Sequence, residues 1–416
     1  MIKTKLRPLS GSTIQLVDGD RGVNYPNKKD FSDNGFCVFL DSSNLTKNGF
    51  DFSSKVFISK NKDEAMGNGK LKRGDLVMNT RGTIGNMGVY KENVPYENIR
   101  INSGMLIIRG GSDYDNGFLY GFFRSNLFYK QVENIMSGSV QSQLPIWIFN
   151  FIQVPELSIP AQQKISTVLS ALDSKIELNN RINAGLEQMA KTLYDYWFVQ
   201  FDFPDENGKP YKTSGGKMVW CEELKRNIPA GWEVKEMNKL LTKNTTKFDF
   251  IDDKHDIDTL DLSVLPSATM CLNEKNSSSA FGTNLFKLSK FDILFGGIRP
   301  YLLKAGFSPF DGLVTGTVHS FRVKNDDEYN FAILTMTHKS MFNFAVANSK
   351  GTKMPVIGAD DLLTYKVAHN EDIIKTFNEF IQFRDIIAHN IIENQTLAEL
   401  RDWLLPMLMN GQVAVK

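Results

Sequence analysis

The chain has few cysteines, no long apolar run and almost no net charge. Its three cysteines, Cys37, Cys221 and Cys271, lie far apart, and the five histidines are scattered. This pattern argues against a disulfide framework or a structural zinc site, and it fits a reducing compartment. No stretch of about 18 apolar residues occurs, so we expect no membrane span. Residues 1–5 lack the apolar core of a signal peptide, which makes the cytoplasm the expected location.

The charge balance leaves the nature of any partner open. Lys and Arg number 48 against 47 Asp and Glu, which gives a formal net charge of +1 over 416 residues. A strongly basic chain would indicate nucleic acid, whereas this balance requires any DNA-binding face to be a local basic cluster offset by acidic surface elsewhere. The length suits two to three domains, and a hydrophobic fraction of 42% is enough for packed cores.

Common catalytic motifs are missing from the sequence. No Asn/Asp-Pro-Pro-Tyr/Phe tetrapeptide of amino-methyltransferases occurs, and Gly69-Lys70 and Gly216-Lys217 lack the remaining parts of a phosphate-binding loop. Pro204-Asp205 is followed at once by Glu206, which is not the spacing of a nuclease site. Neither GxSxG nor HExxH is present. We therefore expect no catalytic residues and no metal site in this chain.

Residues 159–202 have the periodicity of a long helix. From residue 161 the sequence runs without Gly or Pro until Gly185. Apolar residues recur at alternating spacings of four and three, a heptad pattern that predicts a helix in a coiled coil. An amphipathic helix packed on a globular core is the alternative. The seam positions are Ile165, Leu169, Leu172, Ile176, Leu186, Leu193 and Trp197, with Asn179, Asn183 and Ala190 filling the gaps.

A second long helix is predicted over residues 369–411, and it resembles the first. A shift of 211 residues places Asn179 on Asn390, and the same shift places Asn183 on Asn394. A polar Asn in a coiled-coil seam lowers stability but fixes register and partner orientation. We therefore predict that the helices pack antiparallel about a pseudo-two-fold axis, with Asn179 near Asn394. The same axis places Asn183 near Asn390. The alternative is that these side chains face solvent.

The blocks before the two helices, residues 1–158 and 228–368, have the composition of strands joined by turns. Short β-branched and aromatic runs are separated by clusters of Gly, Asn, Asp and Ser. Each block also contains one predicted helix, near residues 118–126 and 329–339. Residues 203–227 are rich in Pro, Gly and charge, which is typical of an exposed linker. The order is therefore block, helix, linker, block, helix.

Two short tracts tie the blocks together as an internal repeat. Gly74-Asp75-Leu76-Val77 matches residues 291–294, Phe-Asp-Ile-Leu. Later in each block, Leu144-Pro145-Ile146 matches Met354-Pro355-Val356. Because the matches keep their order and each block then runs into its long helix, the sequence predicts two similar domains.

Six tracts in and around the first helix carry the pattern of a known family. They are residues 159–165 (IPAQQKI), 172–176 (LDSKI), 179–183 (NNRIN), 186–190 (LEQMA), 196–203 (YWFVQFDF) and 228–234 (IPAGWEV). With them, nearly the whole chain resembles the specificity subunit of type I restriction-modification enzymes. The second half departs from the pattern, because its helix carries residues 389–397 without a preceding Pro-x-Gln-Gln tract.

That resemblance implies an α+β chain with two α/β target recognition domains, separated by two long antiparallel helices in a coiled coil and related as a pseudo-two-fold internal repeat. Each domain would read one half of a split, asymmetric site in double-stranded DNA. The paired helices would act as a spacer and as the docking surface for two modification subunits, to which restriction subunits are added. S-adenosylmethionine, ATP and Mg would be bound by those partner subunits, and no cofactor by this chain.

Candidate DNA contacts are hydrogen-bonding side chains on glycine-containing loops, which can approach phosphates and base edges closely. Any one of these loops is alternatively an ordinary solvated turn. In the first block the candidates are Arg21, Asn24, Tyr25, Thr80, Arg81, Thr83, Ser137, Ser139, Gln141, Ser142 and Gln143. In the second block they are Arg299, Tyr301, Lys304, Lys350, Thr352 and Lys353.

Other interpretations stay open at this point. A coiled-coil adaptor with two globular heads would bind proteins and no DNA. A self-sufficient methyltransferase would bind S-adenosylmethionine by itself. For docking of modification subunits, the outward helix positions are candidates together with Tyr194, Tyr196, Trp197 and Phe198, and packing of these aromatic side chains inside the chain is the alternative.

Overall fold

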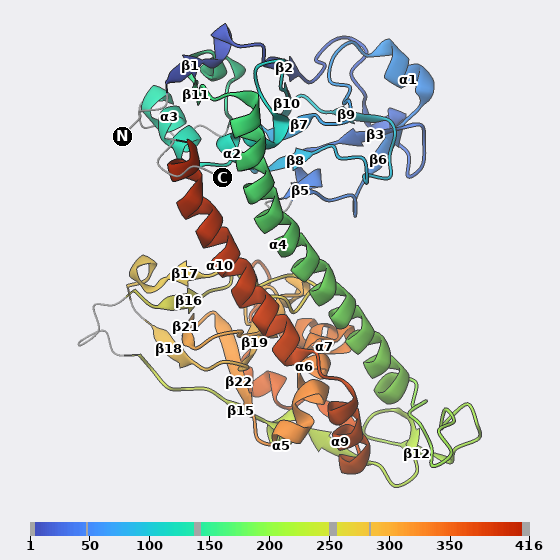
Figure 1. Ribbon diagram of the computed structural model, residues 1–416. Helices are drawn as coiled ribbons and strands as arrows, with labels where there is room; N and C mark the ends of the chain where they lie inside the picture. Colours follow the sequence, from blue (N-terminus) through green and yellow to red (C-terminus); the bar gives the residue numbers. More distant parts are fainter. Residues whose placement is uncertain (1–4, 47–48, 137–142, 249–255, 283, 410–416) are drawn as a thin grey trace. The chain divides into compact units, whose positions relative to one another are not determined.

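The chain folds as two compact units, each of which contains part of both long helices. Unit 1 comprises residues 1–177 and 397–416, and unit 2 comprises residues 178–396. In the colours of Figure 1, unit 1 therefore joins blue and green segments to the red end of the chain. Among the helices that the structure describes, none combines the length and hydropathy of a bilayer-crossing segment. The computed structural model describes residues 5–46, 49–136, 143–248, 256–282 and 284–409.

Unit 1 is built on two sheets. Its strands are β1 (Leu6–Pro8), β2 (Gln15–Asp18), β3 (Cys37–Leu40), β4 (Leu45–Thr46), β5 (Gly49–Phe50), β6 (Val56–Ile58), β7 (Leu76–Asn79), β8 (Met87–Val89), β9 (Ile99–Ile101), β10 (Met105–Arg109) and β11 (Gln153–Pro155). One sheet has the order β2-β10-β7-β8, and the other, β6-β3-β9, contains a parallel pair, β3 with β9. Strands β3 and β7 lie in the interior of their sheets and are wholly buried, which explains their largely apolar sequence.

Helices and further short pairings complete unit 1. Strand β1 pairs with β11, and β4 pairs with β5. The helices are α1 (Lys60–Ala65), α2 (Asn116–Phe123), α3 (Asn126–Met136) and the 3-10 helix η4 (Ile146–Phe151). The sequence predicts a helix near residues 118–126. Helix α2 covers most of that range, and α3 begins at its end.

Unit 2 has the same kind of architecture. Its sheets have the orders β15-β22-β19-β20 and β17-β16-β21-β18, and β14 pairs with β23. The strands are β12 (Met218–Cys221), β13 (Arg226–Pro229), β14 (Glu233–Glu236), β15 (Leu241–Lys243), β16 (Asp258–Leu260), β17 (Asn276–Ser277), β18 (Leu285–Leu288), β19 (Ile293–Gly296), β20 (Ala305–Phe307), β21 (Gly312–Thr315), β22 (Val318–Val323) and β23 (Lys366–His369). The helices are α5 (Met237–Leu240), α6 (Tyr329–Thr337), α7 (Lys339–Asn348), α8 (Ala359–Leu362), α9 (Glu371–Phe380) and the 3-10 helix η7 (Pro300–Leu302).

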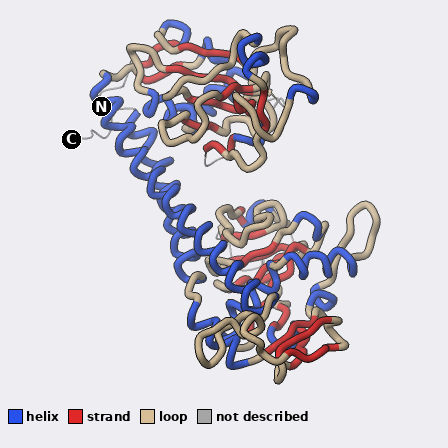
Figure 2. The backbone as a smooth tube through the Cα atoms, turned by 90° about the vertical axis from the view of Figure 1, so that its right-hand side faces the viewer, coloured by secondary structure: helices blue, strands red, loops and turns tan. Residues whose placement is uncertain are grey.

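The two units repeat one topology. Strands β15, β22, β19 and β20 correspond in order and direction to β2, β10, β7 and β8. In each second sheet one pair is parallel, β3 with β9 in unit 1 and β16 with β21 in unit 2. The pairs β1–β11 and β14–β23 also correspond. Figure 2 shows the strands of each unit gathered together in red. The internal repeat predicted from the sequence is therefore confirmed.

The same ion pair, with a buried carboxylate, joins the central strands of the two corresponding sheets, β2-β10-β7-β8 and β15-β22-β19-β20. Asp75, just before β7, accepts hydrogen bonds from Nε and Nη2 of Arg109 on β10, both at 2.6 Å. Asp292, just before β19, accepts hydrogen bonds from Nε and Nη2 of Arg322 on β22, at 2.9 and 3.0 Å. Both carboxylates are buried. The first tract that recurs in the sequence is thus a repeated side-chain arrangement as well as a repeated strand.

Two long helices run antiparallel within each unit. Helix α4 (Ile159–Tyr194) has 36 residues and continues as one π-helical turn, η5 (Asp195–Val199), close to the predicted end at residue 202. Helix α10 (Arg384–Met409) has 26 residues. In unit 1, Nη1 of Arg401 donates to Oδ1 of Asp173 at 2.9 Å. In unit 2, Nδ2 of Asn390 donates to Oδ1 of Asn183 at 2.8 Å. The predicted antiparallel pairing is confirmed in both units.

The second helical segment is interrupted, which corrects the prediction of one helix over residues 369–411. It forms α9 and then α10, with residues 381–383 between them. Ile381 and Phe383 are buried in the core of unit 2, and Nδ2 of Asn330 donates a hydrogen bond to the Ile381 carbonyl oxygen at 2.5 Å. Tertiary contacts therefore end α9 in a stretch whose residues contain no Gly or Pro, where helix propensity alone favours continuation.

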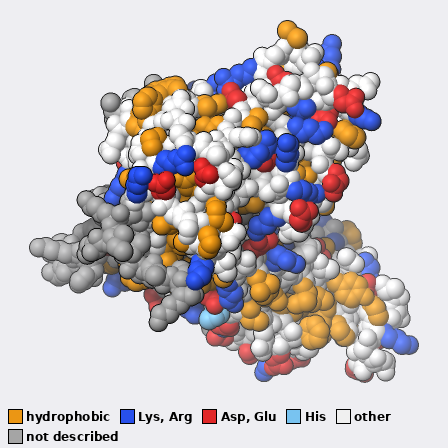
Figure 3. Space-filling model, turned by 45° about the horizontal axis from the view of Figure 1, so that its top comes forward, with side chains coloured by type: hydrophobic (Ala, Val, Ile, Leu, Met, Phe, Trp, Pro, Cys, Tyr) orange, Lys and Arg blue, Asp and Glu red, His pale blue; other side chains and the backbone are white. Residues whose placement is uncertain are grey.

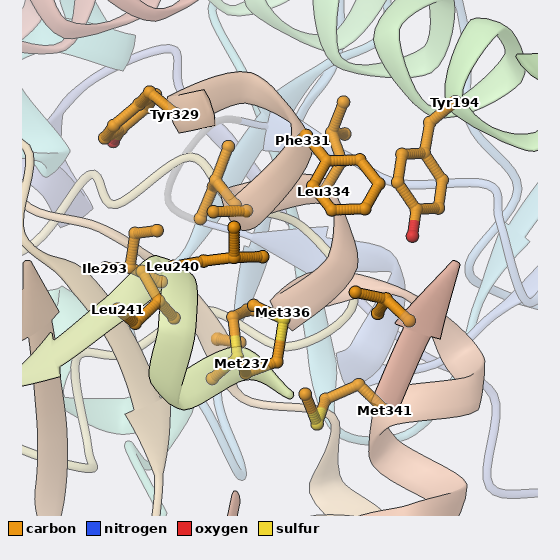
Figure 4. Packing of buried hydrophobic residues seen from close by; sticks show 14 of the residues in the cluster. Tyr194, Met237, Leu240, Leu241, Ile293, Tyr329, Phe331, Leu334, Met336 and Met341 are labelled. Carbon is orange, nitrogen blue, oxygen red and sulfur yellow. The ribbon is translucent and has the colours of Figure 1, made fainter. Parts of the chain in front are cut away.

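The end of α4 packs into the core of unit 2. Figure 4 shows Tyr194 beside Phe331 and Leu334 of α6, and the rings of Tyr194 and Phe331 have centroids 5.9 Å apart. The Tyr194 hydroxyl shares a hydrogen bond with Oγ1 of Thr335 at 2.9 Å, so the buried phenol is satisfied. This contact fixes the helix to the domain that follows it.

Residues 203–227, predicted as an exposed linker, are partly packed against unit 2. The ring of Phe203 is buried and stacks on Tyr211 and Trp232, with centroids 4.8 and 5.3 Å away. Strands β12 and β13 form a hairpin in the same segment. The tips at Gly208 and Gly215 are exposed and have positive φ, as the Gly-rich composition predicts. An aromatic anchor thus converts most of the linker into part of unit 2.

Candidate nucleic-acid interface

The loop after β7 in unit 1 is held by backbone hydrogen bonds on both sides. Thr80 N donates to Gly104 O at 2.8 Å, and Leu144 N donates to Thr80 O at 2.8 Å. Arg81 and Gln143 form the next bridge of this pairing. The Thr80 side chain is only 3% exposed, so it is too buried to enter a DNA groove in this conformation and is left out of our proposal. The predicted residues Ser137, Ser139, Gln141 and Ser142 lie outside the described residues.

Arg81 and Thr83 lie at the tip of this loop, and both are exposed. Oγ1 of Thr83 accepts a hydrogen bond from Nδ2 of Asn79 at 2.8 Å. Asn79 is fully buried and also donates to the Ser42 carbonyl oxygen at 2.9 Å, so it holds the loop in place from below. Within the described residues, the Arg81 guanidinium has no hydrogen bond or ion pair. It is therefore available to an acceptor outside the protein, such as a phosphate or a guanine edge.

Gly82, the residue after Arg81, has a left-handed backbone, and so does the equivalent residue of unit 2. Gly82 has φ of 71°, and a Cβ added there would lie 3.2 Å from Oγ of Ser42. The equivalent position in unit 2 is Arg299, with φ of 51°. A non-glycine residue in this conformation costs roughly 1 kcal/mol, and here the Arg299 N–H is held by Pro355 O at 2.7 Å. Backbone strain of this kind is concentrated at functional sites.

The first predicted loop of unit 1 is tied down by its own side chains. Arg21 forms an ion pair with Asp18 at 3.1 Å. Nδ2 of Asn24 donates to the Ala65 carbonyl oxygen at 2.9 Å. Tyr25 packs edge-on against a phenylalanine ring of β3 and is partly buried. These three residues have partners inside unit 1, in contrast to Arg81, and their contact with DNA stays a prediction.

In unit 2 the corresponding hairpin loop joins β19 to β20 through η7. Tyr301 is exposed on this loop, and Nζ of Lys304 donates to the Leu262 carbonyl oxygen at 2.6 Å. Arg299 is exposed, and its guanidinium has no partner among the described residues. Of the three predicted residues here, Arg299 and Tyr301 are therefore accessible, whereas Lys304 already binds a backbone carbonyl.

A second loop of unit 2 lies beside this hairpin. Lys350 and Val356 exchange two backbone hydrogen bonds, at 2.8 and 2.9 Å, which close a tight hairpin. Val356 also forms a bridge with Ile298 of the first loop. The predicted residues Lys350, Thr352 and Lys353 are exposed on the closed hairpin. The structure thus brings together the residues predicted in the second block, apart from the inward-bonded Lys304.

The pairing of these two loops is the same in both units. Arg81 bridges Gln143 in unit 1, and Ile298 bridges Val356 in unit 2. Arg81 is therefore equivalent to Ile298, and Arg299 follows that position by one residue. The shared feature is the backbone pairing, while the side chains it presents differ between the units.

The second recurring tract is displaced relative to its sequence match. The sequence aligns Leu144 with Met354, but Leu144 N donates to Thr80 O, and the equivalent bond to Gly297 O comes from Ile357 N at 2.9 Å. The two prolines in the tracts are therefore not structurally equivalent. Similar composition located the right segments but gave the wrong register.

The accessible residues that sequence reasoning missed are apolar. They lie on residues 298–304 and 339–357, which contain five basic residues and no Asp or Glu. An acid-free run with apolar residues between basic ones was the available signal. Together with the predicted Tyr301 they form a surface whose residues are between 37% and 52% exposed, and we call it the apolar patch: Tyr301, Leu302, Leu303, Val346, Met354 and Val356.

Charge elsewhere is mixed. Lys, Arg, Asp and Glu side chains lie interspersed on the face shown in Figure 3.

Burial and the neighbouring Asp63 raise the pKa of the Cys37 thiol to about 12, and burial beside Glu187 does the same for Cys271. Within the described ranges, no group of three or more His, Cys, Asp and Glu side chains is placed to hold a metal.

The seam asparagines contact one another in unit 2. Nδ2 of Asn179 donates to Oδ1 of Asn394 at 2.9 Å, and Asn390 donates to Asn183 at 2.8 Å. All four side chains are buried, so they do not face solvent. Nδ2 of Asn179 also reaches Oε2 of Glu393, at 2.6 Å. Both contacts expected from the repeat are present, and the role of these residues in setting register stays a prediction.

Most of the aromatic residues considered for partner docking are packed inside unit 2. Tyr194, Trp197 and Phe198 are buried. The ring of Phe198 has its centroid 4.7 Å from that of Phe331. Tyr196 is 36% exposed and is the one of the four that stays accessible.

Comparison with known proteins agrees with this architecture. A family model described as a type I restriction modification DNA specificity domain matches residues 17–188. The chain is 24% identical over 362 residues to the type I restriction enzyme MjaIX specificity subunit of Methanocaldococcus jannaschii, covering 83% of this chain and 78% of that protein. It is 22% identical over 463 residues to the type I restriction enzyme HindI specificity subunit of Haemophilus influenzae, covering 95% and 98%.

A solved structure shares the fold. The S subunit of the type I restriction-modification system from M. genitalium aligns with a TM-score of 0.55 and 13% identity, over 98% of this chain and 96% of that one. The matched domain, the two relatives and the repeated topology point the same way. Residues 17–188 therefore match the type I restriction modification DNA specificity domain, and the chain is similar over most of its length to specificity subunits of type I restriction enzymes.

Proposed function

We propose that this chain reads a bipartite, asymmetric target in double-stranded DNA, with one half-site for each unit. The observation that carries the proposal is the repeat itself: both units have the same sheet order and the same pair of bridged loops. The loops have the same backbone pairing in both units but carry different side chains. They would therefore recognise different bases, so the two half-sites would differ in sequence.

The long helices supply a spacer of suitable size. At 1.5 Å per residue, the 36 residues of α4 span about 54 Å. The 26 residues of α10 span about 39 Å. One turn of DNA is about 34–36 Å, so a helix pair of these lengths is sufficient to set a fixed gap between two half-sites. The buried asparagine pairs support a pairing with one preferred alignment.

Exposed apolar positions on both helices support docking of two modification subunits, to which restriction subunits would be added. On α4, Leu178, Ile182 and Met189 are spaced by four and seven residues and all are exposed, so they form one stripe. On α10, Leu400 and Trp403 are exposed. S-adenosylmethionine, ATP and Mg would be bound by those partners and no cofactor by this chain. The complex would act in the cytoplasm, where its DNA is.

Selection from random DNA tests the proposal. The chain, purified together with its modification subunits, is incubated with random-sequence duplexes at about 0.15 M salt, because phosphate contacts depend on ionic strength. We expect enrichment of two short blocks separated by a gap of fixed length. A single block would contradict the two-unit model, and no enrichment would favour the protein-binding adaptor. Modification subunits alone serve as the control. Calorimetry with S-adenosylmethionine and the isolated chain tests the alternative of a self-sufficient methyltransferase, because only that alternative predicts binding.

A further inference from the structure

We propose that unit 2 reads its half-site by packing apolar side chains against thymine methyl groups in the major groove, whereas unit 1 reads through hydrogen bonds. The inference rests on the proposed function of the chain as a DNA-reading subunit. It names the base chemistry that one unit recognises.

The bridged loops of the two units carry opposite chemistry. In unit 1 the tip consists of Arg81, Gly82, Thr83 and the paired Gln143, which offer donors and acceptors. In unit 2 the same framework presents the apolar patch, whose six side chains are exposed although their size favours burial. An apolar surface of this extent on a recognition loop indicates a binding surface.

The patch residues are held together by the fold. The bridge between Ile298 and Val356 joins the two loops, and Arg299 N donates to Pro355 O at 2.7 Å. The 3-10 helix η7, which carries Tyr301 and Leu302, packs against α7, from which Val346 comes. Two segments distant in sequence, residues 298–304 and 339–357, thus form one surface.

Charge favours DNA as the occupant of this surface. Its segments have five basic residues and no acidic one, in a chain whose total charge is almost balanced. Within the described residues, Arg299, Lys350 and Lys353 have no ion pair or side-chain hydrogen bond. Apolar side chains flanked by unpaired cations match a groove in which base edges lie between two rows of phosphates.

The apolar group that a base pair displays in the major groove is the C5-methyl of thymine. The major groove is about 12 Å wide and admits a two-stranded ribbon, so it is wide enough for the smaller loop closed by the backbone hydrogen bonds between Lys350 and Val356. The minor groove is about half as wide and displays no methyl. Methyl contact in the major groove therefore fits both the shape and the chemistry of the patch.

Deoxyuridine removes the methyl and leaves the pairing intact, so it is the probe. Duplexes that carry the motif selected from the random pool are made with each thymine replaced in turn by deoxyuridine. Burial of one methyl contributes about 0.8 kcal/mol, so each replacement in the half-site of unit 2 is expected to weaken binding by the complex about fourfold. Replacements in the other half-site are expected to change affinity less than twofold.

Two variants assign the effect to the patch. Leu302→Ala and Met354→Ala remove exposed side chains, so the fold is expected to persist. In both, the loss caused by deoxyuridine should disappear in one half-site only. Val219→Ala removes an exposed apolar side chain of the same unit far from these loops in sequence, and it should leave the fourfold effect unchanged.

The outcomes are distinguishable. Absence of any selected motif refutes the proposed function itself. A selected motif with no deoxyuridine effect in either half-site, or a half-site of unit 2 made of G·C pairs alone, overturns the methyl inference and leaves the proposed function standing. If the variants lose binding although no deoxyuridine replacement has an effect, the patch side chains would instead insert between neighbouring base pairs. Variants that fail to assemble with the modification subunits would identify the patch as a protein interface, and both results overturn the inference.

Discussion

Nδ2 of Asn179 donates a hydrogen bond to Oδ1 of Asn394 at 2.9 Å across the seam between α4 and α10. The 211-residue shift of the internal repeat maps this contact onto the one between Asn390 and Asn183. Most other seam positions are aliphatic, so a shift along the helix would bury these amides against apolar neighbours. One alignment of the helices forms both pairs, so we predict that these asparagines specify register, as polar seam residues do in coiled coils.

Removing one amide tests this relationship. In Asn179→Ala, the Asn394 amide oxygen and the Glu393 carboxylate lose a buried donor. We expect the free energy of unfolding to fall by about 1–3 kcal/mol, measured by urea denaturation. Ser174→Ala, at an exposed position of the same helix, is the control and should change it by less than about 0.5 kcal/mol. Equal stability of the two variants would contradict a role for the amide pair.

Arg81→Ala tests the reading loop of unit 1. Loss of a guanidinium that bonds a base edge is expected to weaken site-specific binding by about 10- to 100-fold, equivalent to about 1–3 kcal/mol. Assembly with the modification subunits, followed by size-exclusion chromatography, should be unchanged. Lys60→Ala, an exposed cation on α1, is the control for general loss of charge. Unaltered affinity in Arg81→Ala would reject the assignment.

Lengthening the helices tests the spacer. One heptad is inserted after Ile176 in α4 and another after Thr396 in α10, at matching levels of the pair. Seven residues add about 10.5 Å, which is about three base pairs at 3.4 Å each. Random-pool selection should return the same two blocks with the gap longer by about three base pairs. An unchanged gap would mean that the helices do not set it, and insertion in α4 alone should impair folding.

The repeated ion pair predicts unequal costs in the two units. Arg109 is 21% exposed in its side chain and Arg322 is 56% exposed. Breaking a pair leaves the cation without its partner, which is worse where water is scarce. Asp75→Ala should therefore lower the free energy of unfolding by about 3 kcal/mol and Asp292→Ala by about 1 kcal/mol, as measured in urea. The reverse order would show that burial of the arginine does not govern the cost.

Asp63 predicts acid sensitivity in unit 1. Burial raises the pKa of this carboxyl, but hydrogen bonds from Lys70 and from Arg100 outweigh burial and hold it below its ordinary value. A pKa lowered by folding contributes stability that is present above the unfolded value, about 3.9, and is lost as pH falls through the folded value.

The variant Asp63→Asn has no ionisable carboxyl at this position. Its free energy of unfolding should therefore lack the pH-dependent contribution that Asp63 makes in the parent chain. Between pH 6 and pH 3, the parent should lose stability more steeply than Asp63→Asn. Asp33→Asn, at an exposed aspartate, should keep the steeper dependence of the parent. Parallel curves for the parent and Asp63→Asn would contradict the prediction.

Local periodicity carried most of what the sequence could predict. The heptad seam located α4, and its two asparagines predicted which residues meet across the pair. Both results depend on residues whose spacing is visible without knowledge of the tertiary fold.

What the sequence did not predict depends on contacts between distant segments. The break at residues 381–383 follows from burial of Ile381 and from its hydrogen bond with Asn330. Thr80 is buried between two backbone segments, to which it is hydrogen-bonded at Gly104 and Leu144, although its tract reads as an open loop. Apart from Tyr301, the apolar patch was missed because a search for hydrogen-bonding residues passes over Leu302 and Met354. Burial and exposure of single side chains are set by packing, which no local pattern encodes.

Unit 1 contains residues from both ends of the described chain. Leu405, Leu408 and Met409 of α10 belong to its hydrophobic core, together with Leu169 of α4. During translation these residues leave the ribosome only after the whole of unit 2. The first recognition domain must therefore wait for the last helix to close its core, and a nascent chain stopped between the two would expose the surface that α10 covers.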